Sequence, residues 1–180
     1  TGGGTAVDQI TGTYNTAVTA PAAPTRTGYT FDGWSRSIPD TMPAEDLTIT
    51  AQWTIKQYTI TFDTAGGSTI APITQDYGTS VTAPEDPTKE GYTFAGWDKE
   101  IPEKLTEDLT ITARWTVNQY TIRFVDGDHE IKSITQDYGT VITPPEDPTK
   151  VGYIFGGWNN LPKTMPVTPE GGLIVSAIWN

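Results

Sequence analysis

Two pairs of neighbouring carboxylates are the residues of this sequence that could do acid–base chemistry. They are Glu85-Asp86 and Glu146-Asp147. A glycoside hydrolase places two carboxylates across a cleft, about 5–9.5 Å apart. These pairs instead adjoin prolines in loops, and the corresponding positions nearer the start of the chain are Ala22-Ala23. We therefore interpret them as solvated loop charges and predict no catalytic residue and no enzymatic activity.

One acidic cluster is a candidate metal site. Asp126-Gly127-Asp128-His129-Glu130 contains the ligand types that calcium and transition metals use. The cluster lacks the ligand spacing of an EF-hand loop and occurs once. His129 is the only histidine of the chain, and nothing near it resembles a nucleophile elbow. The pattern is typical of a polar hairpin turn, so we predict no metal ion and no cofactor.

The six tryptophans could serve as stacking platforms for sugars, as in carbohydrate-binding modules. Their fixed repetition at strand positions favours packing in a core instead. One exposed tryptophan per unit would still allow glycan binding, so a glycan- or host-protein-binding module stays the alternative function.

The tryptophans belong to a repeated stretch that organises the whole chain. Gly-Tyr-Thr-Phe-x-Gly-Trp occurs at 28–34 and 91–97, and recurs with isoleucine in place of threonine at 152–158. The tryptophans that end the three copies are separated by 97 − 34 = 63 and 158 − 97 = 61 residues. Internal repetition at such a period indicates tandem modules. The sequence therefore predicts three units, at 1–55, 56–117 and 118–180.

The second unit reads as strands separated by turns. Residues 58–63 and 109–115 alternate apolar and polar side chains, which is the period of a half-buried strand. Two prolines in 84–91 exclude a helix there, and only 101–108 could form a helical turn or two. Gly96 suits a bulge that re-aims Trp97 toward the core. The strands expected in this unit are 58–63, 70–77, 92–97 and 109–115.

The first and third units depart from this pattern. Aligning Tyr14 with Tyr77 places Thr1 opposite Thr64, so the first unit lacks its opening strand and the sequence is expected to be a fragment. The missing strand would expose a sheet edge, which suggests strand exchange with another chain by β-augmentation. In the third unit, Ile174 and Ile178 are expected to point outward and to contact another module.

Composition excludes several classes of function. The formal net charge is −11, which argues against binding nucleic acid or anionic lipid. The chain has no cysteine, and no run is apolar and long enough for membrane insertion. The linkers 54–57 and 116–119 contain no glycine, proline or serine, so we expect adjacent repeat modules to sit end to end in an elongated array.

At these residues the chain resembles the Listeria–Bacteroides repeat family, also called the internalin B-repeat. The resemblance rests on the strand 58–63 with Gly66-Gly67, on Tyr77-Gly78, on 86–97 and on the closing strand 109–115. It implies a β-rich α+β fold, with β-grasp-like modules similar to ubiquitin or SUMO. An all-β, Ig-like module stays open, because a β-grasp needs a helix on its sheet.

The family resemblance also implies a function and a location. It implies a stalk, spacer or adhesion segment of a bacterial cell-surface or secreted protein, extracellular and without catalytic residues to transfer. We therefore expect a non-enzymatic tandem-repeat segment that spaces, displays or adheres.

Overall fold

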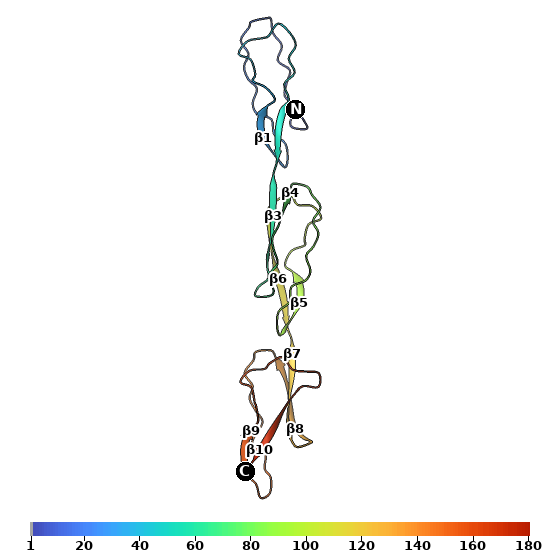
Figure 1. Cartoon of the computed structure of the whole chain (residues 1–180), viewed down its shortest axis with the longest axis vertical. Helices are drawn as coiled ribbons and strands as arrows, with labels where there is room; N and C mark the ends of the chain where they lie inside the picture. Colours follow the sequence, from blue (N-terminus) through green and yellow to red (C-terminus); the bar gives the residue numbers. More distant parts are fainter. Residues whose placement is uncertain (1) are drawn as a thin grey trace. The chain divides into compact units, whose positions relative to one another are not determined.

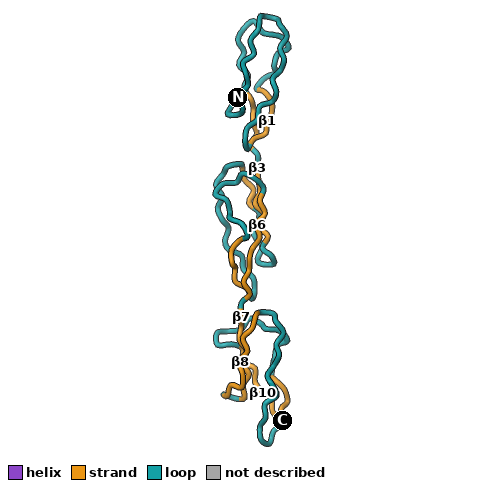
Figure 2. The backbone as a smooth tube through the Cα atoms, turned by 180° about the vertical axis from the view of Figure 1, so that it is seen from behind, coloured by secondary structure: helices purple, strands orange, loops and turns teal. Residues whose placement is uncertain are grey.

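The computed structural model describes residues 2–180, which form strands, turns and loops (Figure 1). Ten strands are assigned within this range, and none of its residues is helical (Figure 2). The predicted α+β, β-grasp-like class is therefore wrong, and the all-β alternative fits. The strands are β1 (Tyr29–Trp34), β2 (Ala51–Ile55), β3 (Gln57–Asp63), β4 (Ile73–Asp76), β5 (Tyr92–Trp97), β6 (Leu109–Val117), β7 (Gln119–Asp126), β8 (His129–Asp137), β9 (Phe155–Trp158) and β10 (Leu173–Trp179).

The segment 101–108, expected to form a helical turn, is not helical. The N–H of Leu105 donates to the carbonyl of Thr79 at 3.0 Å, and its carbonyl accepts from the N–H of Gly78 at 2.6 Å. A helix would use both backbone groups within the segment, whereas here they pair with a facing loop. This pairing leaves Leu105 only 1% exposed. The segment is therefore held by backbone hydrogen bonds to residues 78 and 79 and by one buried leucine.

The chain packs as two compact units. The first comprises Thr1–Phe62, Ala71–Ala83 and Glu100–Ile111, and the second comprises Asp63–Ile70, Pro84–Lys99 and Thr112–Asn180. The three ranges predicted from the sequence stay a prediction. They are called the first, second and third repeat below.

The third repeat, in the second unit, is built on one mixed sheet with the strand order β8-β7-β10-β9. Its centre is a parallel pair, because β7 runs antiparallel to β8 and parallel to β10. The core lies on one face of this sheet, and loops supply part of it. The core residues are Ile122, Phe124, Ile142, Met165 and Val175.

The strands of the second repeat follow the same order, β4-β3-β6-β5. The register of β5 against β6 shifts between Phe94 and Trp97, where Gly96 has a φ of +97°. This confirms the bulge predicted at Gly96. The shift places Trp97 opposite Ala113 and its ring edge-on to Phe94, with the centroids 5.2 Å apart.

The first repeat has a smaller sheet. Its described residues contain β1 paired antiparallel with β2, together with an isolated bridge between Ala17 and Thr41. Residues 47–50, which correspond to the first half of β6, are not a strand.

Candidate functional site at the junctions between repeats

A single residue separates the closing strand of one repeat from the opening strand of the next. Lys56 lies between β2 and β3, and Asn118 lies between β6 and β7. The N–H of Lys56 donates to the carbonyl of Gly28 at 2.9 Å, and its carbonyl accepts from the N–H of Tyr77 at 2.8 Å. Both backbone groups of the connecting residue are thus held, one by each repeat.

The second junction repeats this arrangement. The N–H of Asn118 donates to the carbonyl of Gly91 at 2.9 Å, and its carbonyl accepts from the N–H of Tyr138, also at 2.9 Å. The hydroxyl of Thr93 donates to the side-chain oxygen of Asn118 at 2.6 Å. Fixed backbone partners on both sides leave the connecting residue little freedom to hinge.

A tyrosine ring packs on a buried glycine at each junction. The φ angles are +77° at Gly28 and +76° at Gly91. A Cβ atom on Gly28 would stand 2.0 Å from Tyr77, and one on Gly91 would stand 2.2 Å from Tyr138. Glycine is therefore required at these positions for two reasons, the left-handed backbone and the close approach of the tyrosine ring.

Tyr138 also meets aromatic rings from both of the repeats that it joins. Its centroid lies 6.0 Å from that of Tyr92 in the second repeat and 6.2 Å from that of Tyr120 in the third. Both pairs are edge-on, the geometry that aromatic quadrupoles favour. This tyrosine therefore acts as a wedge between consecutive repeats.

Each repeat contains a second recurring contact, between a cation and the first hairpin turn. Arg26 donates to the carbonyl of Gly2 at 3.0 Å, and Lys89 donates to the carbonyl of Ala65 at 2.8 Å. Both cations also lie over a tyrosine ring, at 3.6 Å from Tyr29 for Arg26 and 4.5 Å from Tyr92 for Lys89.

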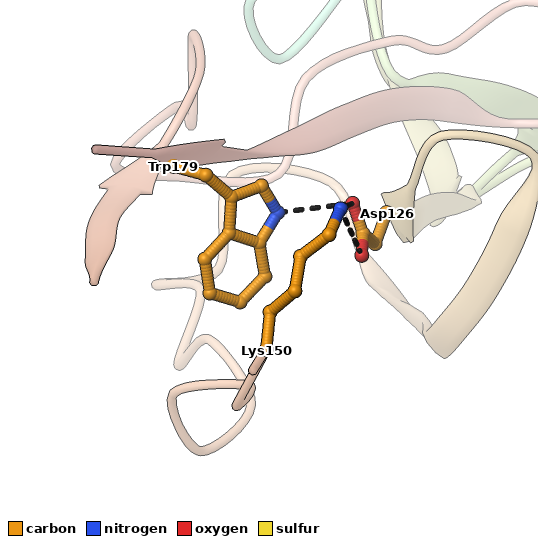
Figure 3. A network of polar contacts seen from close by, with 3 residues as sticks. All are labelled: Asp126, Lys150 and Trp179. Atoms are coloured by element: carbon orange, nitrogen blue, oxygen red, sulfur yellow. Dashed lines mark hydrogen bonds and ion pairs between the residues drawn. The ribbon is translucent and has the colours of Figure 1, made fainter. Parts of the chain in front are cut away.

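In the third repeat a carboxylate replaces the backbone acceptor (Figure 3). Lys150 forms an ion pair with Asp126 at 3.2 Å, and Nε1 of Trp179 donates to Asp126 at 2.9 Å. The Trp179 hydrogen bond and the Lys150 charge hold the pKa of the Asp126 carboxyl below its ordinary value, although partial burial opposes them. In the second repeat, Nε1 of Trp115 donates instead to the carbonyl of Thr64. The site is a structural clamp that closes the turn.

Of the candidate catalytic and metal-binding residues, Asp126 belongs to this clamp and Glu130 forms an ion pair with Arg123 at 2.5 Å. The carboxylate pairs 85–86 and 146–147 lie in loops and are exposed. His129, the first residue of β8, is exposed as well. Residues 2–180 hold no group of three or more His, Cys, Asp or Glu side chains that could bind a metal ion. None of the described residues belongs to a helix with the length and hydropathy that crossing a bilayer requires.

The tryptophans are neither fully buried in a core nor fully exposed as sugar-stacking platforms. All six are half-buried. Trp34, Trp97 and Trp158 each pack edge-on against a phenylalanine of the same strand. None of the six is among the exposed residues of the chain, and glycan stacking on them stays a prediction.

Sequence reasoning missed the tyrosine wedge. Its signal was present, because Tyr77 and Tyr138 recur at the repeat spacing and Gly28 and Gly91 recur as well. In each pair, however, the glycine and the tyrosine belong to different repeats, so only the fold brings them together.

Comparison with known proteins gives the chain a family. The model of the Listeria-Bacteroides repeat domain matches residues 1–52, 58–118 and 120–165. A putative membrane protein of Evansella cellulosilytica is 32% identical over 176 residues, which cover 88% of this chain and 26% of that protein. A putative Gly-rich membrane protein of the same organism is 34% identical over 168 residues, covering 81% of this chain and 19% of that protein.

Internalin H of Listeria monocytogenes is 45% identical over 92 residues, which cover 46% of this chain and 16% of that protein. The chain thus corresponds to about a quarter or less of the length of these relatives. The three matched segments show that the chain belongs to the Listeria-Bacteroides repeat domain family, as three tandem copies.

Proposed function

We propose that this chain is a non-enzymatic spacer segment of a bacterial cell-surface or extracellular protein. The observation that carries the proposal is the backbone arrangement that recurs at the junctions after the first and second repeats. Each junction has one connecting residue, two backbone hydrogen bonds to it and a tyrosine ring over glycine. A spacer must hold the parts at its two ends at a fixed distance. A stiff joint between repeats maintains that distance, whereas a flexible linker does not.

The relatives support the location. Two of them are named putative membrane proteins and one is named an internalin, and each is several times longer than this chain. A segment that recurs inside larger proteins of this kind fits a part that separates other parts. The net charge of −11 keeps such a segment soluble.

Stiffness at the joint can be measured directly. Because the chain has no cysteine, two can be introduced for spin labels, at Thr30 in the first repeat and Thr61 in the second. Pulsed electron–electron resonance should give one narrow distance distribution. Tyr77→Ala should broaden it, whereas Tyr14→Ala should not, because Tyr14 is 73% exposed. A broad distribution in the unsubstituted chain would overturn the spacer proposal.

Adhesion is a second candidate function, favoured by one feature of the third repeat. Ile154, Ile174 and Ile178 are 74%, 58% and 42% exposed, which confirms the outward direction predicted for the last two. The second repeat has Thr93, Thr110 and Arg114 at the corresponding positions. Exposed apolar side chains that gather on one face are typical of interaction surfaces.

The second repeat supplies matched substitutions for testing adhesion. The chain should be screened against immobilised glycans and host proteins, with Ile154→Thr and Ile178→Arg as the variants. Binding that these changes abolish supports adhesion through this face. Binding by neither the chain nor the variants contradicts it and leaves the spacer proposal untouched.

A further inference from the structure

The opening and closing strands of the third repeat lie side by side in the middle of its sheet. The strand order is β8-β7-β10-β9, so β7 and β10 each have a neighbour on both sides. They run parallel, with residues 122–125 of β7 opposite residues 173–176 of β10. Neither is an edge strand with a row of unpaired backbone groups. We call this parallel pair the central ladder.

Tension along the chain must cross the central ladder. The chain enters the repeat from Asn118 at the start of β7 and leaves it after Trp179 at the end of β10. In a parallel pair, the start of one strand and the end of the other lie at opposite ends of the pair. Tension therefore pulls β7 and β10 in opposite directions along their common axis and loads the ladder in shear.

The direction of loading decides how backbone hydrogen bonds break. The bonds of a parallel pair are evenly spaced along the strands. Sliding one strand past the other loads these bonds together, whereas separating two strands from one end loads them one after another. The pair β7 and β8 provides the contrast, because it is antiparallel and Gln119 lies opposite Asp137 at its open end. Shearing the central ladder therefore needs more force than peeling β7 from β8.

Buried side chains cover the central ladder. Ile122 and Phe124 of β7 are 0% exposed, and Val175 of β10, directly opposite Phe124, is 1% exposed. Water competes with backbone hydrogen bonds wherever it reaches them. The core over the ladder limits this competition, and sliding the strands must also separate Phe124 from Val175.

The joint before the third repeat delivers tension without slack. One residue, Asn118, connects β6 to β7. Its N–H and carbonyl are held by Gly91 and Tyr138, each through a hydrogen bond of 2.9 Å. In the second repeat, β3 and β6 are likewise the two central strands of the sheet. The strand that leaves the centre of one sheet therefore continues into the centre of the next.

We propose that the central ladder makes the repeat a tension-bearing element, in which shear between β7 and β10 shields the rest of the repeat from force. Residues 127–172, which include β8 and β9, lie off the path of the tension until the ladder breaks. The inference rests on the proposed spacer function, because a segment between other parts of a longer protein carries tension when those parts are pulled apart.

Single-molecule force spectroscopy on the whole chain tests the proposal. Because the chain has no cysteine, handles can be attached at chosen pairs of introduced cysteines. Gln119→Cys with Asn180→Cys loads the central ladder in shear, and Gln119→Cys with Thr135→Cys peels β7 from β8. All three positions are exposed. The shear geometry should need a force at least about twofold higher, because the evenly spaced bonds of the ladder break together.

The length released identifies the part that yields. In the shear geometry the handles are 180 − 119 = 61 residues apart, which span about 200 Å when extended. The folded path runs along β7 to residue 122 and along β10 from residue 173, about 30 Å in all. Rupture of the ladder should therefore release about 170 Å in one step. Only 135 − 119 = 16 residues lie between the handles of the peeling geometry, which should release about 50 Å.

Two core substitutions separate the ladder from general stability. Forced unfolding depends on the barrier to unfolding rather than on the equilibrium stability. Val175→Ala removes contacts that the sliding strands must break, so it should lower the shear force. Ile142→Ala removes contacts of a residue in the same core but outside both strands. These contacts stay intact until the ladder has parted, so this variant should lose stability in denaturant and keep its shear force.

Equal forces in the two pulling geometries overturn the proposal, and so does equal weakening by Val175→Ala and Ile142→Ala. A first release far below about 170 Å in the shear geometry also overturns it, because another part then yields before the ladder. The handles lie within one repeat, so these results do not depend on the stiffness of the joints. The spin-label distances measure that stiffness separately, which distinguishes failure of this proposal from failure of the spacer proposal.

Discussion

The ring of Tyr77 lies on Gly28, so close that a Cβ atom at residue 28 would stand 2.0 Å from it. The two residues belong to consecutive repeats, and Tyr138 and Gly91 repeat the contact with a separation of 2.2 Å. A glycine of one repeat thus leaves the space that a tyrosine ring of the next repeat fills. The joint is specified by shape rather than by the length of the linker.

Gly91→Ala should destabilise the chain more than Gly152→Ala. Both glycines have a left-handed φ, of +76° and +82°, so alanine at either costs about 1–2 kcal/mol in backbone strain. Only at Gly91 does the new methyl group also meet Tyr138, and overpacking adds about 1–3 kcal/mol. Chemical denaturation of the two variants checks the difference. Equal loss of stability would show that the ring moves away at no cost.

Asn118→Ala should weaken the second joint, whereas Lys56→Ala should leave the first joint unchanged. The side chain of Asn118 accepts a hydrogen bond from Thr93, and a bond of this kind contributes about 0.5–1.5 kcal/mol. The side chain of Lys56 is exposed, and only its backbone makes the junction bonds. Thermal unfolding and spin-label distances across each joint measure the effect. A loss in Lys56→Ala equal to that in Asn118→Ala contradicts the assignment.

Local pattern predicted the strands well. The alternation at 58–63 and 109–115 became β3 and β6, and the glycine before Trp97 marked a bulge. These features depend on neighbours in sequence, which a single chain displays directly. The segment 70–77 was predicted with less accuracy, since only Ile73–Asp76 forms a strand.

The fold class and the joint between repeats could not be predicted from local pattern in the same way. The β-grasp expectation came from resemblance, whereas the segment 101–108, where a helical turn was expected, is not helical and buries Leu105. The pairing of Tyr77 with Gly28 joins residues 77 − 28 = 49 positions apart. No local period encodes such a contact.

Trp158→Ala should unfold the third repeat, whereas Trp158→Phe should be tolerated. Its ring lies 4.9 Å from that of Phe124 and 5.3 Å from that of Phe155, against the core. Truncation to alanine costs about 3–5 kcal/mol. Its Nε1 is buried without a hydrogen-bond partner among the described residues, so phenylalanine removes an unpaired donor and keeps the aromatic contact. Near-ultraviolet circular dichroism would show native packing in Trp158→Phe and its loss in Trp158→Ala.

The Asp126 clamp should make the third repeat sensitive to acid. The folded state lowers the pKa of this carboxyl below its ordinary value of 3.8, through Trp179 first and then Lys150. A lowered folded-state pKa gives stability that is present above the unfolded pKa and is lost as the pH falls through the folded value. Unfolding followed from neutral pH to below 3.8 should therefore show a loss that Asp126→Asn abolishes and Asp128→Asn retains. The same acid dependence in Asp126→Asn and the unsubstituted chain would assign the effect to other carboxylates. The second repeat is the internal reference, because there Trp115 bonds to the carbonyl of Thr64, which does not titrate.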